Sequence, residues 1–213
     1  MNNPFLLICL IGLLYVLVFS GLSLLRREDL SRQFVWEGMS VTFLVLIVMY
    51  VGNVVIHPFY FLIFLYLITM RVRLVVELGN QLSKLGRPQN ALAVYNFALR
   101  LFPDQPSRVI VSLNTGAAYL TGQQPDRAIE VLEQVQGQLG QKFASKYRAS
   151  CCYNLGMAYR RVGRRAEALQ QFREVAEIAP FSDYARLAER ARDTTLKDSE
   201  KPNTSKGIGK NVT

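Results

Sequence analysis

The first seventy residues contain apolar runs that are long enough to cross a lipid bilayer, and this feature constrains the fold more than any other. Residues 4–25 hold no charged side chain. They reach the length of about 20 residues that a helix needs to span a hydrocarbon core. A cleaved signal peptide would begin with positive charge, whereas residues 1–4 are uncharged and Arg26 and Arg27 follow the run. The run therefore predicts a retained membrane anchor.

A second apolar region, residues 39–70, is interrupted near its middle by His57 and Pro58. Because proline ends or kinks a helix, we expect a hairpin with spans near 37–54 and 58–74. As an alternative, residues 59–70 lie flat on the membrane, which leaves two spans. We assign residues 1–74 to a membrane domain. Aromatic residues flank the expected turn, as they do at a membrane interface: Tyr50, Phe59, Tyr60 and Phe61.

Positive charge orients these spans. Arg26, Arg27 and Arg32 lie between the first and second spans, and Arg71 and Arg73 follow the third. The loops that stay in the cytoplasm carry an excess of lysine and arginine. Three spans therefore place the N-terminus outside and everything after residue 70 on the cytoplasmic side, in a bacterial inner membrane or a thylakoid. Two spans would place the later residues on the opposite side.

The histidine and cysteine content argues against metal and redox chemistry. The chain has one histidine, His57, with no acidic residue or cysteine nearby, so we expect a polar turn residue. Cys151 and Cys152 are neighbours, and on a helix they would point about 100° apart. They are therefore expected neither to form a disulfide nor to share a metal, and at least one should be buried.

Beyond residue 70, three segments share one spacing of small and large residues. Each begins with a glycine at 79, 116 or 156, with an alanine 12 positions later and a large residue 16 positions later. The alanines are Ala91, Ala128 and Ala168, and the large residues are Tyr95, Leu132 and Phe172. Small residues allow two helices to cross closely. Gly86 and Gly163 fall where a left-handed residue can end a helix, and Pro103 and Pro180 follow the second helix of their segments.

This pattern resembles the tetratricopeptide repeat (TPR), a pair of helices of about 34 residues. The resemblance covers residues 72–182, with repeats near 72–105, 109–142 and 149–182, and implies an all-α solenoid of three helix pairs. Residues 183–197 are expected to form a capping helix, and residues 198–213 a disordered tail. The second repeat departs from the pattern, because Gly140 replaces the proline and Gln123 the turn glycine. We expect its second helix to be extended, or a looser connection through residues 137–146.

The resemblance also implies a partner-binding groove on the concave face, lined by the first helix of each repeat. Its residues here are Arg73, Asn80, Lys84, Leu113, Asn114, Ala117, Leu120, Tyr153, Met157, Arg160 and Arg161. This gives an apolar middle and two cationic ends. A carboxylate clamp for acidic chain ends is not formed, because its basic positions hold Val76, Ser150 and Asn154.

Four arginines crowd the turn of the third repeat: Arg160, Arg161, Arg164 and Arg165. This basic patch is either a contact for an acidic partner or lipid headgroups, or a solvated helix end that favours the helix dipole. The formal net charge of +9 suits acidic partners. Because the charge is tethered to a bilayer, protein partners, the bilayer and anionic headgroups rank ahead of nucleic acid, which we do not expect as a partner.

The residues after 70 lack the side chains of common catalytic sites. They contain no histidine, no phosphate-binding glycine loop and no acidic cluster for a metal. We therefore expect no enzymatic activity, no cofactor and no metal. The layout is similar to membrane-bound TPR assembly factors of bacteria and plastids, including those for photosystem I. It implies an adaptor that assists assembly or stability of a membrane complex. The alternatives are a permanent subunit of such a complex and an envelope or lipid-associated protein that uses its basic face.

Overall fold

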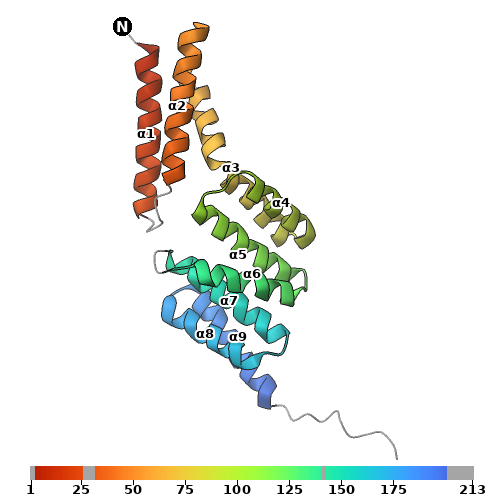
Figure 1. The fold of residues 1–213 in the computed structure, drawn as a ribbon. Coiled ribbons are helices and arrows are strands. Elements are labelled where there is room, and N and C mark those ends of the chain that lie inside the picture. The colour runs from red at the N-terminus through yellow and green to blue at the C-terminus, as the bar shows by residue number, and fades with distance from the viewer. Residues whose placement is uncertain (1–2, 26–31, 141–142, 201–213) are drawn as a thin grey trace, which may run out of the picture.

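The structure is a computed structural model that describes residues 3–25, 32–140 and 143–200. Within these ranges the chain is helical and has no strand, which confirms the all-α prediction. The helices, drawn in Figure 1, are α1 (Pro4–Leu25), α2 (Arg32–Gly52), α3 (Pro58–Lys84), α4 (Pro88–Arg100), α5 (Gln105–Thr121), α6 (Pro125–Gln138), α7 (Ser145–Arg161), α8 (Arg165–Ile178) and α9 (Asp183–Glu200).

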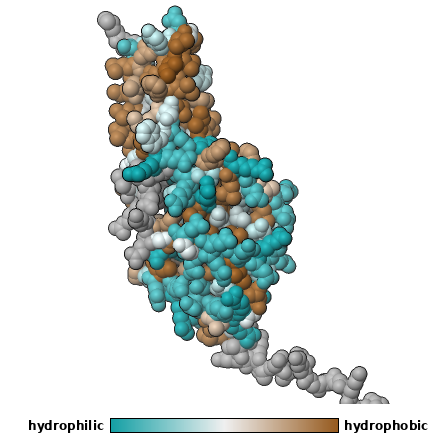
Figure 2. All heavy atoms as spheres, viewed as in Figure 1, coloured by the Kyte–Doolittle hydropathy of each residue, from teal (hydrophilic) through white to brown (hydrophobic). Residues whose placement is uncertain are grey.

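The helices α1 and α2 and the first half of α3 pack together at the N-terminal end of the molecule (Figure 1). Their shared core includes Ile8, Met49, Phe61 and Leu65, each no more than 1% exposed. The outer faces are also apolar, as Figure 2 shows, and many large hydrophobic side chains there are exposed. Each of the three helices is long and apolar enough to cross a membrane.

Small residues bring α1 and α2 into close contact. A Cβ atom built on Gly12 would lie 2.4 Å from Oγ1 of Thr42, and one on Gly38 would lie 2.8 Å from Val16. No side chain fits at such separations without movement of its neighbour. For helices that lie in a bilayer, where lipid tails are as apolar as leucine, such close approach supplies much of the attraction between them.

The expected turn at His57 and Pro58 lies where α3 begins. Nδ1 of His57 accepts a hydrogen bond from the backbone N–H of Phe59 (3.2 Å), so the histidine caps the helix. Proline at the first helical position needs no hydrogen-bond partner for its nitrogen. Tyr50, Phe59 and Tyr60 are exposed near the turn. Phe61 is 1% exposed, so the expectation that it joins an aromatic belt is wrong; its position on α3 turns it into the bundle core.

The helix α3 continues without a break from the bundle into the repeat region. Its first half packs along α1, where the hydroxyls of Tyr15 and Thr69 lie 2.6 Å apart. The first half of α3 therefore lies beside α1 and α2 within the bundle. Residues 59–78 contain no proline or glycine that would break a helix, so the sequence agrees with one continuous helix here.

The pairs α3–α4, α5–α6 and α7–α8 stack in succession, and α9 packs against α7 and α8. The spacing that the three segments share has a direct structural cause. A Cβ atom on Gly79, Gly116 or Gly156 would lie 2.4 to 2.6 Å from the side chain 16 residues later. Those partners, Tyr95, Leu132 and Phe172, are at most 2% exposed.

The turns between paired helices show how the second repeat departs from the other two. Gly86 and Gly163 have φ angles of 71° and 83°, and Gln123 takes the same left-handed conformation with φ 58°. The helix α6 ends at Gln138, so the looser connection is observed and the extended helix is not. Residues 141–142 of that connection lie outside the described residues.

The last helix covers the end of the stack. Ala185, Ala188 and Ala191 of α9 are buried against the preceding pair, whereas Leu187 is 41% exposed and faces away. The helix continues to Glu200, three residues into the region expected to be disordered. The rest of that predicted tail, like Arg26 and Arg27, lies outside the described residues.

Candidate protein-binding surface

The first helices of the pairs line the inner side of the stack. α3 contacts α5, α5 contacts α7, and α7 contacts α9. Within the described residues, no comparable contact joins α4 to α6 or α6 to α8. The second helices are therefore further apart than the first helices. A stack built in this way curves, and its concave face is formed by α3, α5 and α7.

The predicted groove residues differ in how much surface they offer. Arg73, Lys84 and Arg161 are exposed. A second group is half-buried and still accessible: Asn80, Asn114, Ala117, Tyr153, Met157 and Arg160. Leu113 and Leu120 are 3% and 6% exposed and belong to the core shared with α6 and α7. The prediction that these two leucines line the groove is therefore wrong, because packing leaves them almost no surface for a partner.

At the first-repeat end of the surface, Asn80 is partly used by the fold. Its Oδ1 accepts a hydrogen bond from the Tyr95 hydroxyl (2.7 Å), and its Nδ2 donates to Glu77 (3.3 Å). Burial raises the pKa of Tyr95 to about 12, with a further contribution from the nearby Glu77 carboxylate. The phenol therefore stays protonated and holds the asparagine in place.

Glu77 is exposed on the same surface, and the predicted groove does not include it. It follows Arg73 by four residues and precedes Asn80 by three, so the helical spacing alone places it on the same face. Its carboxylate also accepts a hydrogen bond from Gln81 (2.9 Å). This end of the surface is therefore mixed in charge, and the prediction that it is cationic is wrong.

The far part of the surface, on α7, is more apolar. The Tyr153 ring lies 6.3 Å from the Phe172 ring and 5.9 Å from the Tyr184 ring, measured between centroids. Burial raises the pKa of Tyr153 above its usual value. Three helices thus fix the ring, which stands beside Met157 and presents a rigid apolar contact. Rigid aromatic side chains are common anchors in protein interfaces.

The basic patch is largely engaged within the protein. Arg160 donates to the Thr194 hydroxyl of α9 (2.7 Å), and Arg161 donates to the backbone oxygen of Leu120 at the end of α5. Arg164 pairs with Glu167 (2.9 Å) and lies over the Tyr159 ring at 4.4 Å. Arg160 and Arg161 lie in the last turn of α7, where a cation stabilises the end of a helix, so for these two the contacts favour the helix-end interpretation. Arg164 lies at the start of α8 and is held instead by Glu167 and the Tyr159 ring.

The Tyr159 hydroxyl in turn donates to Glu133 of α6 (2.6 Å). Its pKa is raised to about 12, first by burial and then by this carboxylate. The tyrosine therefore links the second and third helix pairs below the arginine cluster. Arg165 is exposed at the start of α8.

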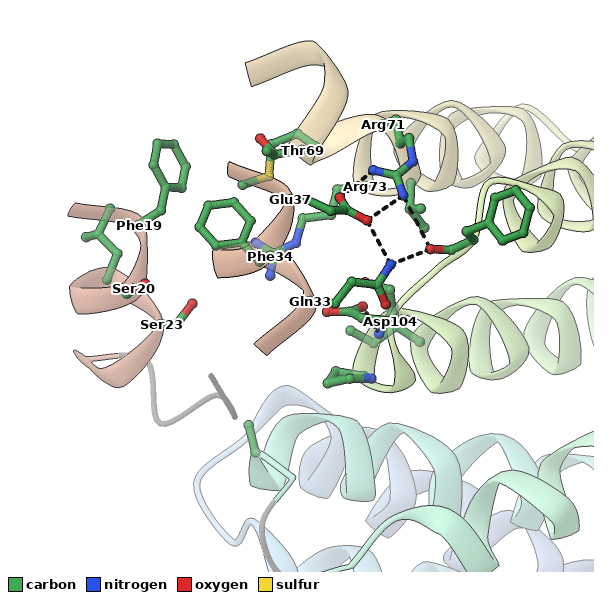
Figure 3. A pocket seen from close by; sticks show the side chains of 18 of the residues that line it. Phe19, Ser20, Ser23, Gln33, Phe34, Glu37, Thr69, Arg71, Arg73 and Asp104 are labelled. Carbon is green, nitrogen blue, oxygen red and sulfur yellow. Dashed lines mark hydrogen bonds and ion pairs between the residues drawn. The ribbon is translucent and has the colours of Figure 1, made fainter. Parts of the chain in front are cut away.

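An ion pair fastens the bundle to the stack. Arg71 of α3 contacts both carboxylate oxygens of Glu37 on α2, at 2.6 and 2.8 Å (Figure 3). It also donates to the backbone oxygen of Leu101 (2.9 Å). Gln33 donates both to Glu37 and to the backbone oxygen of Phe102, each at 2.8 Å. The start of α2 is thus tied directly to the connection between α4 and α5.

Comparison with known families identifies the stack. Two family models, both described as tetratricopeptide repeat, match residues 76–142 and 148–179. The chain is a tetratricopeptide-repeat protein. The matched residues span the three helix pairs from the middle of α3 to the end of α8, and the TPR array is therefore the part of the chain that acts as a protein-interaction scaffold.

Two solved structures with TPR-like repeats share this fold. A putative kinesin light chain with nearly identical TPR-like repeats from Podosopora anserina is 20% identical, with a TM-score of 0.53. The match covers 61% of this chain and 67% of that one. A single-substitution variant of that protein is 21% identical over 61% and 69% of the chains, with a TM-score of 0.50. MamA 41-end from Desulfovibrio magneticus RS-1 is 20% identical over 62% and 77%, with a TM-score of 0.43. No match was found among curated proteins.

Proposed function

We propose that this protein is a membrane-anchored TPR adaptor that assists assembly or stability of an integral membrane complex. The observation that carries the proposal is α3, which is one helix from Pro58 to Lys84 and belongs to both the apolar bundle and the first repeat. A flexible linker would let the array sample many orientations. A shared helix, fastened by the Arg71–Glu37 pair, holds the array in a single orientation relative to the bundle.

A fixed array at a membrane surface suits a partner that is itself held in the membrane. Anchoring raises the effective concentration of the binding surface for such a partner. The proposed contact surface consists of the accessible residues on α3, α5 and α7: Arg73, Asn80, Lys84, Asn114, Ala117, Tyr153, Met157, Arg160 and Arg161. Glu77 is added to this surface. The proposed partner presents apolar side chains to Tyr153 and Met157 and mixed charge to the α3 end.

The positive-inside rule supports a cytoplasmic array. Arg32, Arg71 and Arg73 lie at the end of the bundle that joins the array, and the turn between α2 and α3 has no lysine or arginine. The proposed location is a bacterial inner membrane or a thylakoid, with the bundle crossing three times.

Site-specific photocrosslinking in native membranes tests the proposed surface. A photoreactive phenylalanine derivative replaces Lys84 or Thr121 on the concave helices, and Ala93 or Glu130 on the second helices serves as a control. All four positions are exposed. One partner should crosslink from Lys84 and Thr121 and not from the controls. Equal crosslinking from all four positions, or from the controls alone, would remove the concave surface from the proposal.

Stoichiometry separates a transient factor from a permanent subunit, which is the alternative. Purification in mild detergent should recover the partner in substoichiometric amounts and enriched in incomplete complexes. Recovery at a constant one-to-one ratio with the finished complex supports the permanent subunit instead. A role that depends on the basic patch is less favoured, because Arg160, Arg161 and Arg164 are engaged within the array.

A further inference from the structure

A pocket of about 130 Å³ lies where the bundle meets the TPR array (Figure 3). It is bounded by the end of α1, the start of α2, the middle of α3 and the start of α5. The region just before α7 also contributes. A cavity of similar size can hold a group as large as benzene. If the bundle crosses a bilayer, this pocket lies at the level where the acyl chains end and the headgroups begin.

The pocket wall is amphipathic. Phe19, Leu22 and Phe34 form apolar parts of the lining on the bundle side. Leu22 is 44% exposed, and Val18 and Leu14, one and two turns back along α1, are 48% and 56% exposed, so an apolar surface leads from the pocket along the outside of the bundle. The side toward the array is polar and carries hydroxyl, amide and charged groups.

The charged groups among the described lining residues balance. Glu37 and Arg71 neutralise each other through their two hydrogen bonds. Asp104 caps α5 by accepting a hydrogen bond from the Ser107 N–H (3.0 Å), and Arg73 is the second cation of the lining. An anionic group would gain no net attraction here, because each guanidinium group is matched by a carboxylate.

Ser20 supplies an independent sign of a ligand. Its Oγ is buried, lines the pocket and has no hydrogen-bond partner among the residues that the structure describes. A buried hydroxyl without a partner is destabilising, so such groups are rare unless something else satisfies them. Thr69, which also lines the pocket, already donates to the backbone oxygen of Leu65 (2.8 Å). Of these two hydroxyls, only that of Ser20 lacks a hydrogen-bond partner.

We propose that this pocket binds the headgroup of a membrane lipid that has no net charge. The polar head lies between the Glu37–Arg71 pair and the start of α5, with Ser20 as a hydrogen-bond partner, and an acyl chain follows the apolar face of α1. The apolar path along α1 favours a lipid over a water-soluble solute, and the balanced lining favours a zwitterionic or neutral head over an anionic one. The inference rests on the membrane anchoring in the proposed function.

Native mass spectrometry of the full chain tests this site. The protein is released from detergent micelles that hold equal amounts of phosphatidylethanolamine, which is zwitterionic, and phosphatidylglycerol, which is anionic, with identical acyl chains. One phosphatidylethanolamine per chain should be retained in preference. Equal retention of both lipids, preference for the anionic lipid, or complete loss of lipid on release would overturn the proposal.

Two substitutions locate the retained lipid. Ser23→Phe places a ring in the pocket and should lower retention about tenfold, equivalent to about 1.4 kcal/mol. Ser40→Phe is the matched control, because Ser40 is exposed on α2 and outside the pocket lining. Ser20→Ala removes only the unpartnered hydroxyl and should lower retention without reducing helix content. Equal retention by the Ser23→Phe and Ser40→Phe proteins would mean that only lipid around the bundle is bound.

Failure of the lipid-site proposal can be distinguished from failure of the proposed function. A chain that does not fractionate with membranes contradicts both proposals. A chain that is membrane-bound and crosslinks its partner through the concave face, yet retains no lipid selectively, contradicts only the lipid site.

Discussion

At the residue scale, three glycines set the geometry of the TPR array, because each lies beneath a large buried side chain of its paired helix. At Gly116 the closest atom to an added Cβ would be Cγ of Leu132, at 2.5 Å, and Leu132 is fully buried. Neither helix can move away without opening the core that α5 and α6 share with α7. The same glycine spacing that identifies the repeats in the sequence is thus a packing requirement.

Gly116→Ala should lower the free energy of unfolding of the array by about 1–3 kcal/mol, because overpacking a closed core is destabilising. Gly137→Ala is the matched control. Nothing lies within 4 Å of a Cβ there, and alanine in α6 should stabilise by about 0.5–1 kcal/mol. Urea unfolding of the detergent-solubilised chain, followed by circular dichroism, measures both. Equal effects of the two substitutions would contradict the close-packing account.

Gln123 holds a left-handed conformation that the first and third repeats give to glycine. For a residue with a side chain, the left-handed backbone conformation costs about 1–2 kcal/mol of folding free energy. Gln123→Gly should therefore raise the free energy of unfolding by about 1 kcal/mol, after the entropy that glycine loses on folding is subtracted. The same unfolding experiment measures this change, and a destabilised Gln123→Gly protein would show that the side chain has another role.

The two neighbouring thiols should be unreactive in the folded protein. Cys151 and Cys152 are both buried, which confirms the expectation for this pair, and burial raises the pKa of each to about 12. A disulfide reagent at neutral pH should modify them only on unfolding. Because the pKa of an unfolded thiol is near its ordinary value of 9.0, the free energy of unfolding should fall as pH rises from about 9 toward 12. Rapid modification of the native protein would contradict this account.

At the element scale, α3 sets the orientation of the TPR array relative to the bundle. Arg71 and Glu37 have side chains that are 26% and 25% exposed, so their pair is only partly screened by solvent. Together with Gln33 they hold the start of α2 against the connection after α4. The array therefore keeps its orientation through one continuous helix and one lateral contact.

Arg71→Ala should broaden the distance distribution between spin labels placed at Ser40 in the bundle and Ala93 in the array, measured by pulsed electron resonance. Losing the pair should cost about 1 kcal/mol or less of overall stability, in line with partly exposed ion pairs. Arg100→Ala, an exposed residue at the end of α4, should leave the distribution unchanged. Identical distributions in all three proteins would mean that α3 alone fixes the orientation.

The sequence pattern predicts helix pairing better than it predicts which residues remain at the surface. The glycine spacing locates all three pairs, because close crossing requires it. The family resemblance places Leu113 and Leu120 in the groove by analogy of position. Yet Val109, Leu113, Gly116 and Leu120 follow one another at intervals of four, three and four, which is the pattern of one buried helix face. The Arg71–Glu37 pair joins residues 34 positions apart, and no local pattern indicates it.

At the scale of the whole molecule, an apolar bundle and a TPR array share one helix, and the proposed function depends on which side of a membrane the array occupies. The bundle exposes a large apolar surface, which a bilayer would cover. The turn between α2 and α3 then lies on one side and the array on the other. Cys151 and Cys152 are too buried to report sidedness, so an introduced thiol is needed.

Cysteine labelling with a membrane-impermeant maleimide tests this arrangement most directly. Cys9 is replaced by alanine, and a single exposed cysteine is introduced as Val55→Cys in the turn or Ala93→Cys on α4. In intact cells the Val55→Cys protein should be labelled, and the Ala93→Cys protein should be labelled only after the membrane is opened. Labelling of Ala93→Cys in intact cells, or release of the chain from membranes as a water-soluble protein, would contradict a cytoplasmic array anchored by three membrane-crossing helices.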